Sequence, residues 1–212
     1  MKKTISYGST SAMQQVCLQI GKTIIQAVVN TQGVSVMAAF TAVNRVDDFA
    51  YIPQQNIGHA MTTFIAQNKG AGKKERIRRG FQSGIGIELV YGLILLVLMY
   101  FGAEKIMGLF TSQEDAQVVA LGRSYLHLVS WMYILPAITN GIQGFFRGMG
   151  DLKVTLYSTF MNMAGRVLAV IVMFLVFHLG FVSLAWANLI GWIMMLLFEI
   201  PLLMRQLKEL RK

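Results

Sequence analysis

Two adjacent carboxylates and an arginine stand inside an otherwise apolar stretch, in the segment NRVDDFA. Arg45 and Asp48 are three residues apart and therefore share one face of a helix, as do Asn44 and Asp48, four apart. A carboxylate inside a membrane helix is costly and usually binds a cation or a proton. The alternative is a self-neutralising pair of Arg45 and Asp48 near the external end of the helix. Asp47 has no matching partner on its own face and is the better binding candidate.

Three further ionisable residues lie in apolar stretches. Arg166 is predicted to form a structural ion pair rather than to contact a substrate. Its candidate partners are Asp47, Asp48 and Glu88. Glu88 itself is either a membrane-buried proton carrier or a side chain that extends back toward a basic loop. Glu199 stands close to the basic C-terminal segment and is interpreted as an interfacial anchor.

Amide side chains recur at close to helical spacing along the first apolar stretch. They are Gln14, Gln15, Gln19, Gln26 and Asn30. A polar stripe facing lipid is expensive, so these residues are expected to line a cavity or to face protein. Asn140 and Gln143 are candidates to extend the same surface.

Two prolines are expected to bend helices beside such a cavity. Pro53, with Gly58 after it, is predicted to kink the second helix, and Pro136 the fourth. Bent helices suit a protein that alternates between two openings, although proline kinks also occur in static bundles. Pro53 and Pro136 are therefore the candidate hinges.

The residues needed for enzymatic or metal chemistry are missing from the pattern. The basic segment QNKGAGKKERIRRG lacks the first glycine and the Ser or Thr of a phosphate-binding loop. The three histidines have no partner four residues away, and the single Cys17 excludes an internal disulfide. No Ser/His/Asp group and no catalytic pair of carboxylates is present. We therefore expect no enzyme, no metal site and no cofactor.

The composition indicates a membrane protein. Of the 212 residues 55% are hydrophobic and only 14% are charged, and the mean hydropathy is +0.54. Soluble domains carry about 25% charged residues. Spans of about 20 apolar residues cross a bilayer, and six are predicted in a single all-α domain over residues 1–212. They cover residues 8–32, 34–67, 81–101, 117–147, 153–177 and 181–204.

The net charge of +9 does not indicate nucleic-acid binding, because the cations are confined to short segments between the apolar stretches. If both termini are cytosolic, the inside segments are 1–7, 68–80, 147–153 and 205–212. These four segments hold 14 of the 19 lysines and arginines. The positive-inside rule therefore predicts an even number of spans with both ends in the cytosol. The basic loop around Gly72 fixes this orientation and lies where membrane lipid headgroups are within reach.

An ordered set of motifs resembles the second half of MATE (multidrug and toxic compound extrusion) transporters, of the MOP superfamily. These are NTQGVSVMAAFTAVNRVDDFAYIPQQNIGHAM, FIAQNKGAGKKERIRRG, GIQGFFRGMGDLK and GRVLAVIVMFLVFHLGFVSLAWANLIGW. The resemblance covers roughly residues 10–204. It implies the C-terminal six-helix lobe of a two-lobe transporter, with an N-terminal lobe in the same full-length chain or in a second chain.

The resemblance also implies a function. The expected activity is efflux of small organic cations or drugs by ion-coupled antiport, through alternating access, in the plasma or inner membrane. The coupling ion, H⁺ or Na⁺, stays open. Sodium-coupled members use carboxylates on the first and fourth helices of this half, but residues 1–46 and 116–150 contain no Asp or Glu. The key aspartate of the proton-coupled branch belongs to the N-terminal lobe.

Two alternatives remain beside antiport. One is half of a lipid-linked oligosaccharide flippase of the same superfamily, for which Lys22, Arg45 and Arg166 are the available cavity cations. The other is a non-transporting remnant or an accessory membrane subunit.

Overall fold

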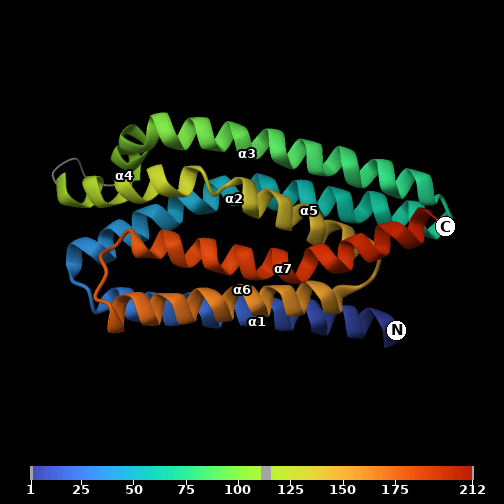
Figure 1. The fold of residues 1–212 in the computed structure, drawn as a ribbon, viewed down its shortest axis with the longest axis horizontal. Helices are drawn as coiled ribbons and strands as arrows, with labels where there is room; N and C mark the ends of the chain where they lie inside the picture. Colours follow the sequence, from blue (N-terminus) through green and yellow to red (C-terminus); the bar gives the residue numbers. More distant parts are fainter. Residues whose placement is uncertain (1, 111–115, 212) are drawn as a thin grey trace.

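The computed structural model describes residues 2–110 and 116–211, and within them the chain is helical and has no strand (Figure 1). The predicted all-α class is confirmed. The helices, in chain order, are α1 (Lys2–Asn30), α2 (Val34–Gly70), α3 (Lys74–Phe110), α4 (Ala116–Ser130), α5 (Ile134–Gly148), α6 (Leu152–Ile171), the short π-helix η1 (Val172–Val176) and α7 (Ser183–Arg211).

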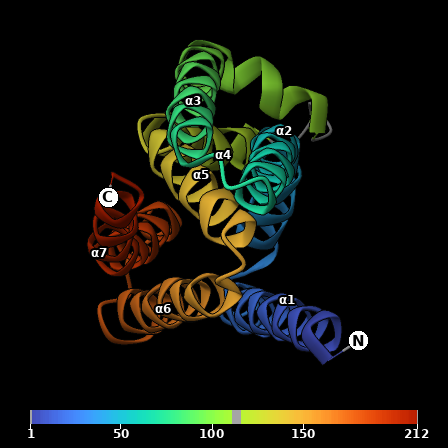
Figure 2. The ribbon, with the colours of Figure 1, turned by 90° about the vertical axis from the view of Figure 1, so that its right-hand side faces the viewer.

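The helices form two groups, which Figure 2 shows in end view. In one group α6 packs between α1 and α7, and in the other α2, α3, α4 and α5 pack on one another. The N- and C-termini lie at the same end of the bundle, together with the α2–α3 and α5–α6 turns (Figure 1). The basic segments are therefore gathered at one end, as the predicted orientation requires, although the orientation itself stays a prediction.

Glycines end the helices at these two turns. Gly72 and Gly150 adopt positive φ angles of 69° and 77°, which glycine reaches without steric cost. The Lys73 amide then donates to the Asn68 carbonyl at 2.9 Å, which closes the turn after α2. The Lys69 ammonium donates to the carbonyl of Met149, so the two turns are held to each other.

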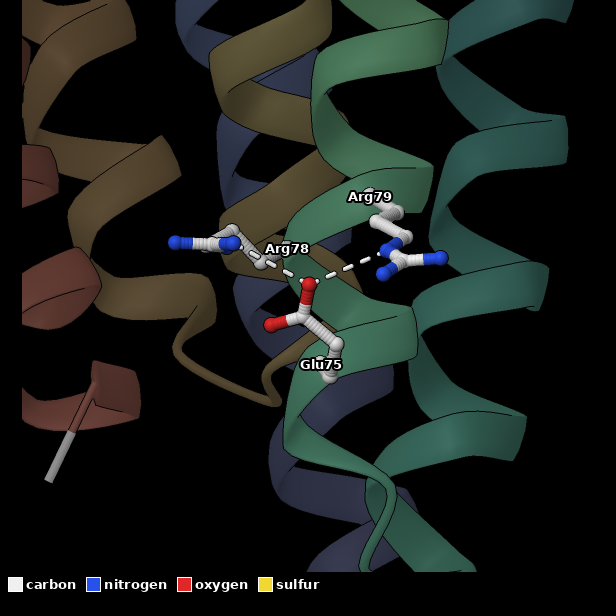
Figure 3. A network of polar contacts seen from close by, with 3 residues as sticks. All are labelled: Glu75, Arg78 and Arg79. Carbon is white, nitrogen blue, oxygen red and sulfur yellow. Dashed lines mark hydrogen bonds and ion pairs between the residues drawn. The ribbon is translucent and has the colours of Figure 1, made fainter.

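The first turn of α3 carries a small charge cluster (Figure 3). One carboxylate oxygen of Glu75 accepts hydrogen bonds from Arg79 and Arg78, each at 3.0 Å. These hydrogen bonds lower the pKa of Glu75, which precedes the apolar part of the helix. The acid therefore stays ionised and offsets part of the basic charge at the turn.

The predicted fourth span is a bent pair of helices. The axes of α4 and α5 meet at 57°, with a break at residues 131–133. Pro136 stands in the first turn of α5, where its ring conflicts with the carbonyl four residues earlier, so the helix breaks before it. By contrast, α2 continues as one helix through Pro53.

Within the described residues, three helices are long and apolar enough to cross a membrane: α3, α6 with its continuation to Phe174, and α7. The α4–α5 pair makes a fourth if it is counted as one bent span. The other two predicted spans correspond to α1 and α2, whose amide and charged side chains lower their hydropathy. That these two also cross the membrane stays a prediction.

Two apolar clusters hold the bundle together at opposite ends. One contains Val43, Leu126 and Phe174, and the other contains Ile65, Phe81 and Phe145. A polar region lies between them.

Helices α2 and α5 meet at very short range. At Gly144 an added Cβ would lie 2.6 Å from the carbonyl oxygen of Gly58. Thr62 donates to the carbonyls of both glycines, at 2.9 and 3.2 Å. Gly144 and Gly148 form a small-xxx-small pair, which lets helix backbones approach closely in membranes.

Candidate binding cavity

A cavity of about 400 Å³ lies between α1, α2, α5, α6 and α7. Sites for small molecules typically measure 300–1,000 Å³. Many of the candidates singled out in the sequence line it, among them Gln14, Gln15, Gln19, Asp47, Asp48, Asn140, Gln143 and Arg166. Pro136 lines it as well, which places the bend of the α4–α5 pair at the cavity wall.

Asp47 on α2 is the most constrained acid of the cavity. Its side chain is only 6% exposed, and it accepts a hydrogen bond from Tyr133 at 2.5 Å and one from Tyr125 at 3.3 Å. The Tyr125 hydroxyl in turn accepts from the Asn188 amide at 2.7 Å. Hydroxyl donors stabilise the carboxylate without cancelling its charge, so the charge remains available to a cation.

A second polar cluster joins α1 to α5 and α6. Gln14 is buried, and its amide donates to Thr159 at 2.8 Å and to Gln143 at 3.4 Å. Gln143 donates to Ser158 and Thr159, both at 3.4 Å. The amide side chains of α1 were predicted to face a cavity or protein. Gln14 does both, because it lines the cavity and bonds to α5 and α6.

The cavity carries basic side chains as well as acids. Lys22, Arg147 and Arg166 line it from α1, α5 and α6. The ion pairs formed by the described residues all lie elsewhere, near the ends of helices. The pair of Arg45 with Asp48 is therefore wrong for this structure. Arg166 makes no direct ion pair among the described residues, but its charge acts on Asp47, one of its predicted partners. The direct hydrogen bonds to Asp47 come from tyrosine hydroxyls.

Other candidates lie outside this cavity. Arg45 lines a separate space of about 500 Å³ with Gln26 and Asn30, which are themselves joined by a hydrogen bond of 2.7 Å. Glu88 is fully buried in α3 beside Gly141 of α5, and neither carboxyl oxygen has a hydrogen-bond partner among the described residues. Pro53 does not belong to the lining. The extended, snorkelling alternative for Glu88 is therefore wrong, because the side chain points into the protein.

The interpretation of Glu199 as an interfacial anchor is also wrong. The side chain is 0% exposed and lies inside the bundle on α7. The physical reason is helical phase, since the face of α7 that carries Glu199 packs on α5 and α6.

The sequence pattern did not reveal the aromatic side of the site. Tyr51 and Trp192 line the cavity with their ring centroids 6.4 Å apart, and Tyr133 lies 5.7 Å from Tyr51. The one available signal was the spacing of Tyr125 and Tyr133, since residues eight apart lie on similar faces of a helix. Within residues 2–110 and 116–211, no group of three or more His, Cys, Asp or Glu could hold a metal ion.

Comparison with known proteins shows the family. The MatE family profile matches residues 11–168. The probable multidrug resistance protein YoeA of Bacillus subtilis is 24% identical over 145 residues, which are 68% of this chain and 31% of that protein. The probable multidrug resistance protein NorM of Rhizobium meliloti is 28% identical over 174 residues, or 78% and 36% of the two chains. The chain thus spans about a third of the length of these relatives.

Solved structures show the same fold. A MOP superfamily transporter from Pyrococcus furiosus superposes with a TM-score of 0.90 at 16% identity, over 97% of this chain and 45% of the other. An outward-facing multidrug resistance MATE transporter superposes with a TM-score of 0.89 at 16% identity, also over 97% of this chain and 45% of the other. The resemblance seen in the sequence is confirmed, and the chain belongs to the MatE family.

Proposed function

We propose that this chain is the C-terminal lobe of a two-lobe transporter that exports organic cations and drugs by ion-coupled antiport, in the plasma or inner membrane. The relatives named as multidrug resistance proteins support the substrate class. The coverage of 45% of two solved transporters supports the assignment to one lobe.

The observation that carries the proposal is Asp47 in the cavity wall, held by two tyrosine hydroxyls. A desolvated carboxylate attracts a cation strongly when no protein cation pairs with it directly, and Arg166 acts on Asp47 without a direct ion pair. The faces of Tyr51 and Trp192 on the same cavity add cation–π attraction for a flat or quaternary cation. An acid flanked by aromatic rings therefore suits organic cations of varied shape.

The exposed side of the cavity supports a second lobe. Several lining residues on α1 and α2 are polar and exposed, among them Gln15, Gln19, Asp48 and Gln55. Such side chains are stable at membrane depth only against protein or water, not against lipid. A second lobe that faces α1 and α2 would enclose the cavity between the two halves, which is the arrangement that alternating access requires.

The coupling ion is proposed to be H⁺ or Na⁺, bound in exchange for the cation. Asp47 and Asp48 are the acids of the cavity lining. A single acid that binds either the ion or the drug, but not both, is sufficient for exchange.

Replacement of Asp47 by Asn tests the proposal. Asn keeps the size of the side chain but removes its charge, so ethidium efflux and drug resistance should fall about tenfold or more, while the amount of protein in the membrane stays the same. Glu104→Gln is the matched control, because Glu104 pairs with Arg123 on exposed helix surfaces outside the cavity. Unchanged efflux by the Asp47 variant would refute the proposal.

A second candidate function follows from the three basic side chains of the cavity, Lys22, Arg147 and Arg166. They favour an anionic cargo such as a lipid-linked oligosaccharide. The Pyrococcus furiosus relative is itself described as having a binding pocket of reverse polarity. Lys22→Gln with Arg166→Gln distinguishes the two functions, since it should abolish flipping of an anionic lipid-linked sugar but leave or improve ethidium efflux.

A further inference from the structure

Glu199 stands in an environment that does not suit an ionised carboxylate. It is 0% exposed, and neither carboxyl oxygen has a hydrogen-bond partner of ordinary geometry among the described residues. Burying a lone carboxylate costs several kcal/mol or more, so such a group is stable there only while it carries its proton or has a counter-charge.

The counter-charge lies on the neighbouring helix. Ser158 of α6 and Gln143 of α5 stand beside the carboxyl, and of the charged groups on the helices packed against α7 it is Arg147 of α5 that acts on it. On α7 itself the next cation, Arg205, pairs with Glu209 at 3.5 Å. Arg147 is therefore the one counter-charge that Glu199 has available within the described residues.

Arg147 also belongs to the cavity. It lines the cavity together with Gln143, which lies four residues earlier on the same face of α5. The Nε of Arg147 is buried and has no hydrogen-bond partner among the described residues. Arg147 thus belongs to the cavity lining and also acts on Glu199, and on the cavity side its charge acts on His59 of α2.

We propose that Glu199 and Arg147 form a proton-controlled charge switch at the base of the cavity. While Glu199 carries its proton, Arg147 is unpaired and its positive charge acts on the cavity. When the O–H bond breaks, the proton passes to water in the cavity past Gln143, and the electron pair stays on the carboxylate. The ionised Glu199 then pairs with Arg147, and the field of the guanidinium group in the cavity is largely cancelled.

The switch gives a direction to the exchange, a step that rests on the proposed function. A cation enters the cavity more readily when Arg147 is neutralised, so proton release from Glu199 favours cation binding. By linkage, cation binding favours proton release by the same factor. Uptake of a proton then expels the cation, which is the order of events that antiport requires.

Infrared spectroscopy tests the proton site without any transport assay. The protein is purified as it occurs in the membrane, with any second lobe attached, and the carboxyl C=O band is followed as the pH is raised. We expect a band from a buried protonated carboxyl that Glu199→Gln removes and that disappears at high pH. Glu209→Gln is the matched control, an exposed acid on the same helix, and should leave this band in place. No Glu199 band at any pH, or a band that never responds to pH, would overturn the proposal.

The role of Arg147 is tested in the same way. In Arg147→Gln the carboxyl loses its counter-charge, so the Glu199 band should persist through the pH range in which it disappears from the wild type. Thermal unfolding of the variant in detergent shows whether the fold is intact, and Arg147→Lys, which keeps the charge, should restore the wild-type response. Disappearance of the band at the same pH in Arg147→Gln would contradict the switch.

Coupling to the cation is measured with ethidium. Binding to the wild type should release a proton into weakly buffered solution, and Glu199→Gln should abolish this release and weaken binding about 5- to 150-fold, the usual range of coupling between two sites. Unchanged proton release in the variant would overturn the coupling. Failure of the wild type to bind ethidium would instead refute the proposed function, while the infrared titration would still decide on the switch.

Discussion

The close backbone contact between α2 and α5 gives a quantitative prediction. Gly144→Ala places a methyl group 2.6 Å from the carbonyl oxygen of Gly58 and 3.2 Å from its Cα. An ordinary carbon–oxygen contact is about 3.3 Å, so α2 and α5 must separate by roughly 0.7 Å. The obstacle is backbone on a long helix, which cannot move aside as a flexible side chain can. Overpacking of this kind costs about 1–3 kcal/mol.

The control separates this contact from helix propensity. Alanine in place of glycine inside a helix stabilises it by about 0.5–1 kcal/mol at either site. Gly86 is also helical, in α3, but an added Cβ there meets nothing within 4 Å. The difference between Gly144→Ala and Gly86→Ala therefore isolates the contact, at about 1–3 kcal/mol or a factor of about 5 to 150 in the folding equilibrium.

The assay is equilibrium unfolding in mixed micelles, with increasing sodium dodecyl sulfate and the helical circular dichroism as readout. We expect Gly86→Ala to unfold at the same or a higher concentration of sodium dodecyl sulfate than the wild type, and Gly144→Ala at a clearly lower one. If the two variants unfold together, the helices are not in contact at Gly58 and Gly144, and the packing described for α2 and α5 is refuted.

Two further predictions concern the acids. Tyr133→Phe removes the shorter hydrogen bond to Asp47 and should weaken ethidium binding by about 1.5–3 kcal/mol, whereas Tyr125→Phe should weaken it by less. Fluorescence titration measures both effects, and equal effects would contradict the geometry. Because Arg79 and Arg78 lower the pKa of Glu75 in the folded protein, its stabilisation is present above the unfolded pKa and is lost as the pH falls through the folded one. Glu75→Gln should therefore be slightly less stable than the wild type at neutral pH and equally stable in acid, measured by thermal unfolding across pH; a difference that grows in acid would refute this.

Much of the fold follows from the sequence because lipid imposes a simple pattern. The long apolar runs correspond to α3, α6 and α7, and Pro136 marks the broken α4–α5 pair. The Gln series of α1 indicated a cavity because amides are too costly to face lipid. These features depend on one helix at a time, so a single sequence is sufficient to predict them.

The partners of the buried acids could not be predicted, because they depend on how helices are rotated against one another. Arg166 was expected to pair with Asp47, Asp48 or Glu88, but the phases of α2, α4 and α5 bring Asp47 into hydrogen bonds with Tyr125 and Tyr133 instead, while Arg166 lies on the same cavity. Glu199 has the same spacing from the basic C-terminus whether it points outward or inward. Only the packing of α7 on α5 and α6 turns it toward Arg147.

The 57° break between α4 and α5 has a consequence for Asp47. One of its hydroxyl partners, Tyr125, belongs to α4, and the other, Tyr133, stands at the start of α5. The carboxylate is thus fastened to both sides of the joint, and the α2 amide of Gln54 also reaches the backbone carbonyl of Tyr133 at 3.4 Å. If the joint straightens, the two hydroxyls cannot both keep their distances to a fixed carboxylate. A change in the angle between α4 and α5 would therefore also change how strongly the Asp47 carboxylate is stabilised by hydrogen bonds, and with it the charge that a cation in the cavity meets.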